Sequence, residues 1–187
     1  VFVGNWLFGV QGVASAASLT VGLAVVALTI VDGAAFLGLK TRGDLRRETR
    51  LFGHAAQVAY LVLAVGALVL GRSVPHVDVT APTTLALLGI TVVLAVVYVV
   101  ASRRGRHYVA FAAVAGQVYG LVALVATLLY PLVDPAVGRT AEAAIVSSLP
   151  LNLTTIGTAL LLPLVAVYFV VLYSAFDGPV DEADAYT

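Results

Sequence analysis

Long apolar segments separated by short polar ones form the dominant pattern of this 187-residue sequence. Each apolar segment holds about 20 residues, enough for a helix to cross a hydrocarbon layer about 30 Å thick. The segments lack the polar stripe of a helix on the surface of a water-soluble bundle. The pattern predicts five transmembrane helices, at about residues 15–39, 51–70, 83–102, 108–130 and 153–176. We therefore expect an all-α integral membrane protein, with residues 1–187 forming a single transmembrane helical domain.

The connecting segments 40–50, 71–82, 103–107 and 131–152 hold the Gly, Pro and charged residues that end membrane helices. Eight of the ten Lys and Arg residues fall in segments 40–50 and 103–107, which lie on the same side of the membrane. The positive-inside rule assigns this side to the cytoplasm. The N-terminus is then outside and the C-terminus is cytoplasmic, in a multi-pass protein of the cell membrane.

Composition agrees with a membrane protein and excludes several kinds of ligand site. Charged residues make up 11% of the chain and the mean hydropathy is +1.04, whereas soluble domains carry about 25% charged residues. The net charge of +0 gives no basis for binding nucleic acid. Cys and Met are both absent, which removes disulfides, thiolate metal sites and methionine haem ligands.

Three histidines remain as possible metal or haem ligands. His54 lies at a helix start, His76 in an outer segment and His107 in an inner turn, so none is expected at the membrane depth of a buried haem. Phosphate-binding glycine loops, metal-ligand spacings and catalytic triads are not recognisable either. We expect the chain to bind no metal or haem alone and to carry no catalytic residue.

Asp32 is the most informative single residue. It lies about eight residues inside the cytoplasmic end of the first helix, a depth of roughly 12 Å at 1.5 Å per residue. A carboxylate within hydrocarbon costs a few kcal/mol, so it usually faces a partner, a polar cavity or a proton path. Asp32 is a candidate for a proton path; the alternative is a hydrogen bond to a neighbouring helix.

Small residues recur at helical spacing in the first and fourth helices. They include Gly22 and Gly33 in the first, and Gly116 and Gly120 in the fourth. Because small residues let helix backbones approach closely in lipid, these positions predict packing seams rather than a ligand site. Gln117 borders the second seam and fits an interhelical hydrogen bond better than a quinone contact, although either is compatible with its position.

Two sequence blocks resemble a known family. The first is the string at residues 33–45 (GAAFLGLKTRGDL), followed by Thr49 and Arg50. The second comprises Ser147, Ser148, residues 153–155, Pro163, Tyr168, Tyr173, Phe176 and Gly178. Their content, order and spacing are similar to subunit II of the cytochrome bd-type quinol oxidases. The resemblance covers essentially the whole chain but corresponds to the C-terminal half of the family's two-repeat subunit. We therefore expect the N-terminal half to be missing, separate or truncated.

The resemblance implies a membrane complex that oxidises quinol, reduces oxygen to water and builds a proton gradient. Haems b and d and the quinol site are expected in the partner subunit I. This chain would brace subunit I, seal the complex in the lipid bilayer and aid proton or oxygen access. At Asp32 the sequence departs from the family, whose members have His or Gln before the Gly-Ala pair.

Two other interpretations stay open at this point. One is a small proton-coupled transporter or channel subunit that uses Asp32, because intramembrane carboxylates are common in proton-coupled carriers. It predicts symmetric self-association and an ion-dependent flux without haem. The other is a purely structural membrane protein, in which Asp32→Asn would alter stability slightly and activity not at all.

Overall fold

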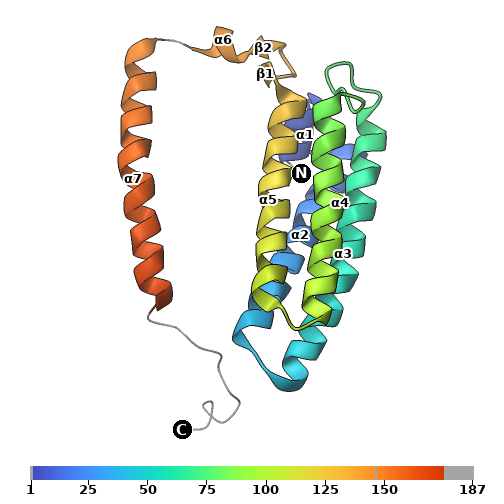
Figure 1. Cartoon of the computed structure of the whole chain (residues 1–187). Helices are drawn as coiled ribbons and strands as arrows, with labels where there is room; N and C mark the ends of the chain where they lie inside the picture. The colour runs from blue at the N-terminus through green and yellow to red at the C-terminus, as the bar shows by residue number, and fades with distance from the viewer. Residues whose placement is uncertain (1, 146, 175–187) are drawn as a thin grey trace.

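The computed structural model describes residues 2–145 and 147–174. Within these ranges, five helices are long and apolar enough to cross a membrane, which confirms the all-α multi-pass prediction. They are α2 (Ala16–Lys40), α3 (Gly43–Gly71), α4 (Pro82–Arg103), α5 (His107–Leu129) and α7 (Ser148–Ser174). Helices α2 to α5 run alternately up and down as a four-helix bundle, and α7 lies beside it (Figure 1).

The two ends of the bundle differ in structure (Figure 1). One end, here called the basic end, carries the short α2–α3 and α4–α5 turns and their Lys and Arg residues. The opposite end carries the short helices α1 (Phe2–Phe8) and α6 (Ala141–Ala144), with an antiparallel hairpin of β1 (Leu132–Asp134) and β2 (Arg139–Thr140). Sequence periodicity did not predict these short elements. Trp6 joins two of them by donating its Nε1–H to the carbonyl of Val133 at 2.7 Å.

Helix α3 begins at Gly43, eight residues before the predicted start. Only Thr41 and Arg42 separate it from α2, and Gly43 has a φ of +65°, which suits glycine at a sharp change of direction. The first two turns contain good helix formers, and Asp44 favours the positive end of the helix dipole. At 29 residues the helix is about 43 Å long, so these polar turns extend past the hydrocarbon layer.

Helix α7 also begins earlier than predicted, at Ser148 instead of residue 153. Pro150 falls in its first turn, where the missing N–H would have no helical partner in any case. The hydroxyls of Thr154 and Thr155 donate to the carbonyls of Pro150 and Leu151, so these threonines lie inside the helix rather than capping it. The predicted end at residue 176 lies outside the described residues.

Helix α7 contacts the bundle near the basic end. Tyr173 meets Phe36 of α2 edge to face, with ring centroids 6.4 Å apart, and Phe36 also meets Phe111 of α5 at 6.2 Å. No residue of α7 is buried, whereas α2 contributes nine buried residues. The folded core of the described chain is therefore the α2–α5 bundle.

Candidate functional site

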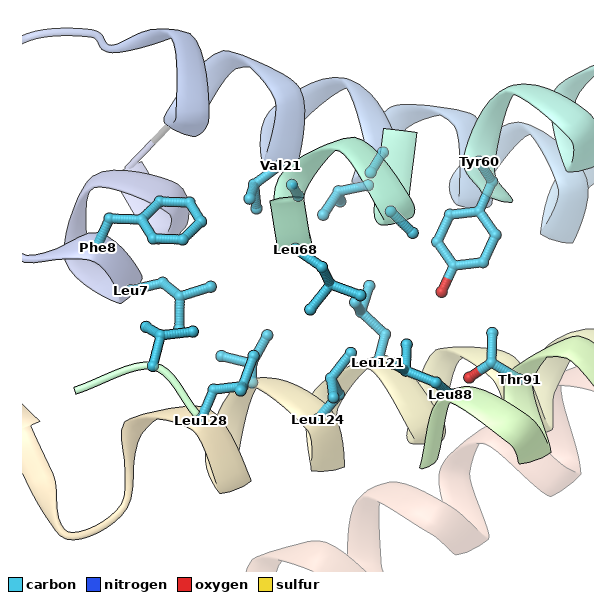
Figure 2. A pocket seen from close by; sticks show the side chains of 16 residues that line it. Leu7, Phe8, Val21, Tyr60, Leu68, Leu88, Thr91, Leu121, Leu124 and Leu128 are labelled. Carbon is cyan, nitrogen blue, oxygen red and sulfur yellow. The ribbon is translucent and has the colours of Figure 1, made fainter. Parts of the chain in front are cut away.

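An apolar cavity of about 60 Å³ lies in the half of the bundle away from the basic end (Figure 2). Leu7 and Phe8 of α1 close one end of it, while Tyr60 and Thr91 stand at the other. Thr91 donates its hydroxyl to the carbonyl of Leu87 at 2.9 Å. Because a buried water needs two to four polar partners, this lining favours an apolar occupant over water.

A pair of buried amides crosses the bundle between α3 and α5. The Nε2 of Gln57 donates to Oε1 of Gln117 at 2.9 Å, and the reverse bond measures 3.2 Å. The two side chains are 2% and 0% exposed. The pair satisfies two of the polar groups that lipid would leave unpaired, so it fixes the register of α3 against α5.

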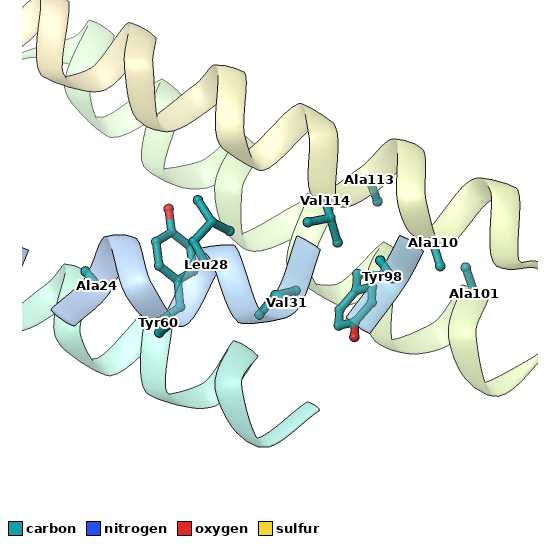
Figure 3. Close-up of a cluster of buried hydrophobic side chains, with 11 residues drawn as sticks. Ala24, Leu28, Val31, Tyr60, Tyr98, Ala101, Ala110, Ala113 and Val114 are labelled. Carbon is teal, nitrogen blue, oxygen red and sulfur yellow. The ribbon is translucent and has the colours of Figure 1, made fainter. Parts of the chain in front are cut away.

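A second polar cluster connects α3 with α4 near the basic end. His54 Nε2 lies 2.8 Å from the hydroxyl of Ser102, and its ring meets Tyr98 edge to face with centroids 5.7 Å apart. Tyr98 belongs to the main buried cluster, together with Tyr60 (Figure 3). Its hydroxyl reaches the backbone at Gly53, where a side chain would leave no room for it.

The basic end holds a small pocket of about 20 Å³ between all four bundle helices. Arg46 and Arg50 of α3, Ser102 of α4 and His107 of α5 contribute polar groups to it. The Nε of Arg46 is buried, and no hydrogen-bond partner for it is found in the described part of the chain. The pocket thus gathers positive charge at the level where the bundle helices end.

Asp32, the predicted proton-path residue, is half-buried on α2. It lines neither the apolar cavity nor the basic pocket. Among residues 2–145 and 147–174 it has no hydrogen bond or ion pair. The structure therefore does not bring Asp32 together with the buried polar groups of the bundle.

The glycines predicted to mark packing seams occupy different environments. Gly116 and Gly120 face α4: a methyl group added to Gly116 would lie 3.0 Å from Leu94, and one added to Gly120 would lie 3.6 Å from Thr91. Gly22 is half-buried, whereas Gly33 is exposed and has nothing within 4 Å of an added methyl group. Two of the four glycines thus lie in the α4–α5 contact.

Comparison with known proteins decides the family. A family model described as cytochrome bd terminal oxidase subunit II matches residues 1–176. The chain belongs to this family. No curated protein matches the chain. As a subunit II it is a multi-pass membrane subunit of a respiratory oxidase, which confirms the resemblance drawn from the two sequence blocks.

A cytochrome bd oxidase uses haems, and the described residues of this subunit II do not fit one. His76 Nε2 is bound to the carbonyl of Leu7 at 2.8 Å, and His54 Nε2 is bound to Ser102. His107 borders the small basic pocket, whereas the apolar cavity is lined by no histidine. The enclosed apolar cavity of about 60 Å³ is far smaller than the pockets of about 300–1,000 Å³ that hold ordinary ligands. His76 also borders an open pocket of about 560 Å³ beside the α3–α4 loop, but its Nε2 is already bound to Leu7.

Sequence reasoning about this subunit II found one member of the amide pair and missed the other. Gln117 stood beside a stripe of small residues, which singled it out. Gln57 lies four residues after Gly53 and eight after Thr49, on the face of α3 that turns inward. That spacing could have predicted that Gln57 is buried on the inner face of the helix. The cavity and the basic pocket were not predictable, because each is lined by four or more separate elements.

Proposed function

We propose that this chain is a haem-free part of a quinol:oxygen oxidoreductase that braces the haem-bearing subunit I and seals the complex in lipid. The haems of the complex supply the electron transfer and oxygen chemistry. The chain corresponds to the second repeat of a two-repeat subunit, with its basic end in the cytoplasm. Eight of ten Lys and Arg residues at that end support this orientation.

The observation that carries the bracing role is the contrast in burial between α7 and the bundle. Helix α7 is as apolar as the others, yet none of its residues is buried in this chain. Large apolar side chains such as Leu160, Leu164 and Val170 are between 65% and 71% exposed. A surface of this kind needs lipid or another protein chain to cover it. Subunit I is the protein partner that we propose for this surface.

The visible spectrum and subunit content of the complex test this role. We would purify the complex in mild detergent through a tag on this chain. A reduced-minus-oxidised spectrum with haem b and d signals, together with a larger co-purifying subunit, is expected. A colourless homo-oligomer would instead favour the proton-coupled transporter, which family membership makes the weaker alternative. Asp32 also lines neither the apolar cavity nor the basic pocket.

Proton access is a second part of the proposal, and Asp32 is its candidate residue. A half-buried carboxylate about 12 Å inside the helix end is costly in lipid unless a partner chain or a water path faces it. Asp32→Asn in the assembled complex should lower turnover and proton release. Unchanged values of both would rule out the proton role.

Oxygen access is the third part, and the apolar cavity supports it. A dry cavity of about 60 Å³ can hold a small apolar molecule such as dioxygen. Ala64→Leu should fill the cavity and raise the KM for oxygen of the complex. Ala55→Leu on the exposed face of α3 is the matched control and should leave the KM unchanged. An equal effect of both substitutions, or of neither, would exclude a route through this cavity.

A further inference from the structure

The basic pocket lies where a membrane protein meets lipid headgroups. It lies beside the last turn of α4 and the first residue of α5, which mark one edge of the membrane-spanning region. Arg46 and Arg50 enter it from the first two turns of α3, the part that extends beyond the hydrocarbon. Basic pockets between helices at this level are suited to anionic headgroups.

Within the described residues, this chain does not balance the charges in the pocket. No ion pair of Arg46 or Arg50 is found within residues 2–145 and 147–174. The nearby acids of α3, Asp44 and Glu48, are exposed and do not line the pocket. A half-buried guanidinium has lost part of its hydration, so it gains most from an anion that replaces the missing water.

The polar groups of the pocket have the chemistry that an oxyanion requires. Guanidinium groups bind phosphate oxygens in a planar fork, and the buried Nε of Arg46 offers a donor with no partner in the described chain. Ser102 and Tyr98 also line the pocket. The Ser102 hydroxyl is already bound to the carbonyl of Val99 and to His54 Nε2, so the free donors come from the arginines. The volume of about 20 Å³ is enough for one oxygen-sized group, so the rest of a bound phosphate would remain at the open side.

We infer that the pocket formed by Arg46, Arg50, Ser102 and His107 binds a phosphate group, with one oxygen seated between the four helices. A phosphate diester of an anionic phospholipid and free inorganic phosphate share this chemistry. The site does not depend on the role of the chain in the oxidase. A bound phosphate would join the ends of all four bundle helices and so stabilise their arrangement.

The test uses the assembled complex after delipidation, with its thermal midpoint and its bound phospholipid as readouts. Phosphatidylglycerol, phosphatidylcholine and sodium phosphate are added separately, and retained lipid is measured by native mass spectrometry. A ligand that binds only the folded state raises the midpoint. The double variant Arg46→Gln/Arg50→Gln should bind phosphatidylglycerol about tenfold more weakly or worse, because two charge-assisted contacts are lost.

The matched control removes the same charge from exposed positions. Arg47→Gln/Arg104→Gln changes neighbouring turns at the basic end but leaves the pocket intact, so its affinity should fall by about twofold or less. An equal loss in both double variants would show non-specific attraction and overturn the site. Stabilisation by sodium phosphate as strong as that by phosphatidylglycerol would support the site with free phosphate as the ligand.

A measurement on the unsubstituted complex guards against variants that fail to assemble. Phosphatidylglycerol with a photoreactive headgroup should crosslink to peptides covering residues 42–50 and 102–108. Crosslinks spread evenly along the lipid-facing helices would overturn the proposal. So would the absence of any midpoint change with both phosphatidylglycerol and phosphate.

Discussion

Helix α7 and the α2–α5 bundle have similar apolar sequences and opposite degrees of burial. All five long helices pass the same test of length and composition for crossing a membrane. Yet the bundle helices each bury several side chains, and α7 buries none in this chain. Hydropathy therefore identifies which segments enter lipid, but it does not show which of them pack together.

The difference lies in a few polar and small residues. In the bundle, Gln57 and Gln117 pair across two helices, and Gly53 lets Tyr98 approach the backbone of α3. In α7 the hydroxyls of Thr154, Thr155 and Ser174 donate to carbonyls of their own helix. The bundle is thus held by interactions between helices, whereas these hydroxyls of α7 are satisfied within α7 itself.

The largest effect is expected from Gly53→Ala in the bundle. Gly157→Ala on α7 adds the same methyl group and serves as the comparison. In Gly53→Ala the new methyl group would overlap the Tyr98 hydroxyl and lie 2.8 Å from Ala34. Overpacking of this kind costs about 3 kcal/mol of unfolding free energy. In Gly157→Ala on α7 nothing lies within 4 Å, so the stability should stay the same or rise slightly. Thermal unfolding in detergent measures both.

A second substitution shows whether the loss of stability comes from the contact between the new methyl group and the Tyr98 hydroxyl. Gly53→Ala combined with Tyr98→Phe removes the hydroxyl that the methyl group meets, so part of the lost stability should return. Equal effects of Gly53→Ala and Gly157→Ala would contradict the close α2–α3–α4 packing described here.

The amide pair gives the next largest effect. Gln57→Leu leaves the fully buried Gln117 without its partner and should cost about 1–2 kcal/mol. Replacing both glutamines by leucine removes both polar groups, so the double variant should be more stable than the sum of the single changes predicts. A double-mutant cycle of unfolding free energies measures this coupling. A cycle with additive effects would mean that the two amides do not interact.

The aromatic contact between α7 and the bundle should have a smaller effect. Phe36→Leu removes the ring that meets Tyr173, an interaction worth about 0.5–1.5 kcal/mol. Because the chain contains no cysteine, spin labels can be placed at Tyr119→Cys on α5 and Leu162→Cys on α7. The distribution of distances between them should broaden in the isolated Phe36→Leu chain and narrow again in the assembled complex. No change on assembly would argue against a partner that covers α7.

The sequence predicted the spans better than the ends and the contacts. Three helices start and stop within one residue of their predicted bounds, because hydropathy changes sharply there. The starts of α3 and α7 were missed since Asp44 to Arg50 is polar yet helical, and Pro150 is tolerated in a first turn. Among the candidate site residues, Gln117 was found through its position in a helix. The pairing with Gln57 depends on how α3 packs against α5, which periodicity alone does not determine.

The smallest expected effect concerns pH, and it arises in the loop between α3 and α4. Hydrogen bonds from the side chain and backbone N–H of Thr80, at 2.8 and 2.9 Å, hold the pKa of Asp78 below its ordinary value of 3.8. A lowered carboxyl pKa stabilises the folded state above pH about 4, and this stabilisation is lost as the pH falls through the lowered value. The described part of α7 carries no acidic or basic side chain that titrates in this range.

Thr80→Val tests this loop directly. The substitution removes the hydroxyl bond, so the pKa of Asp78 should rise toward its ordinary value, and carbon NMR of the labelled carboxyl group measures it. Thr155→Val is the matched control, because that hydroxyl donates to the carbonyl of Leu151 within α7 and touches no carboxylate. If Asp78 titrates at its ordinary value in the unsubstituted chain, the loop does not hold these bonds in solution. A shift caused equally by Thr155→Val would mean that α7 and the α3–α4 loop are coupled, which the separation of α7 from the core argues against.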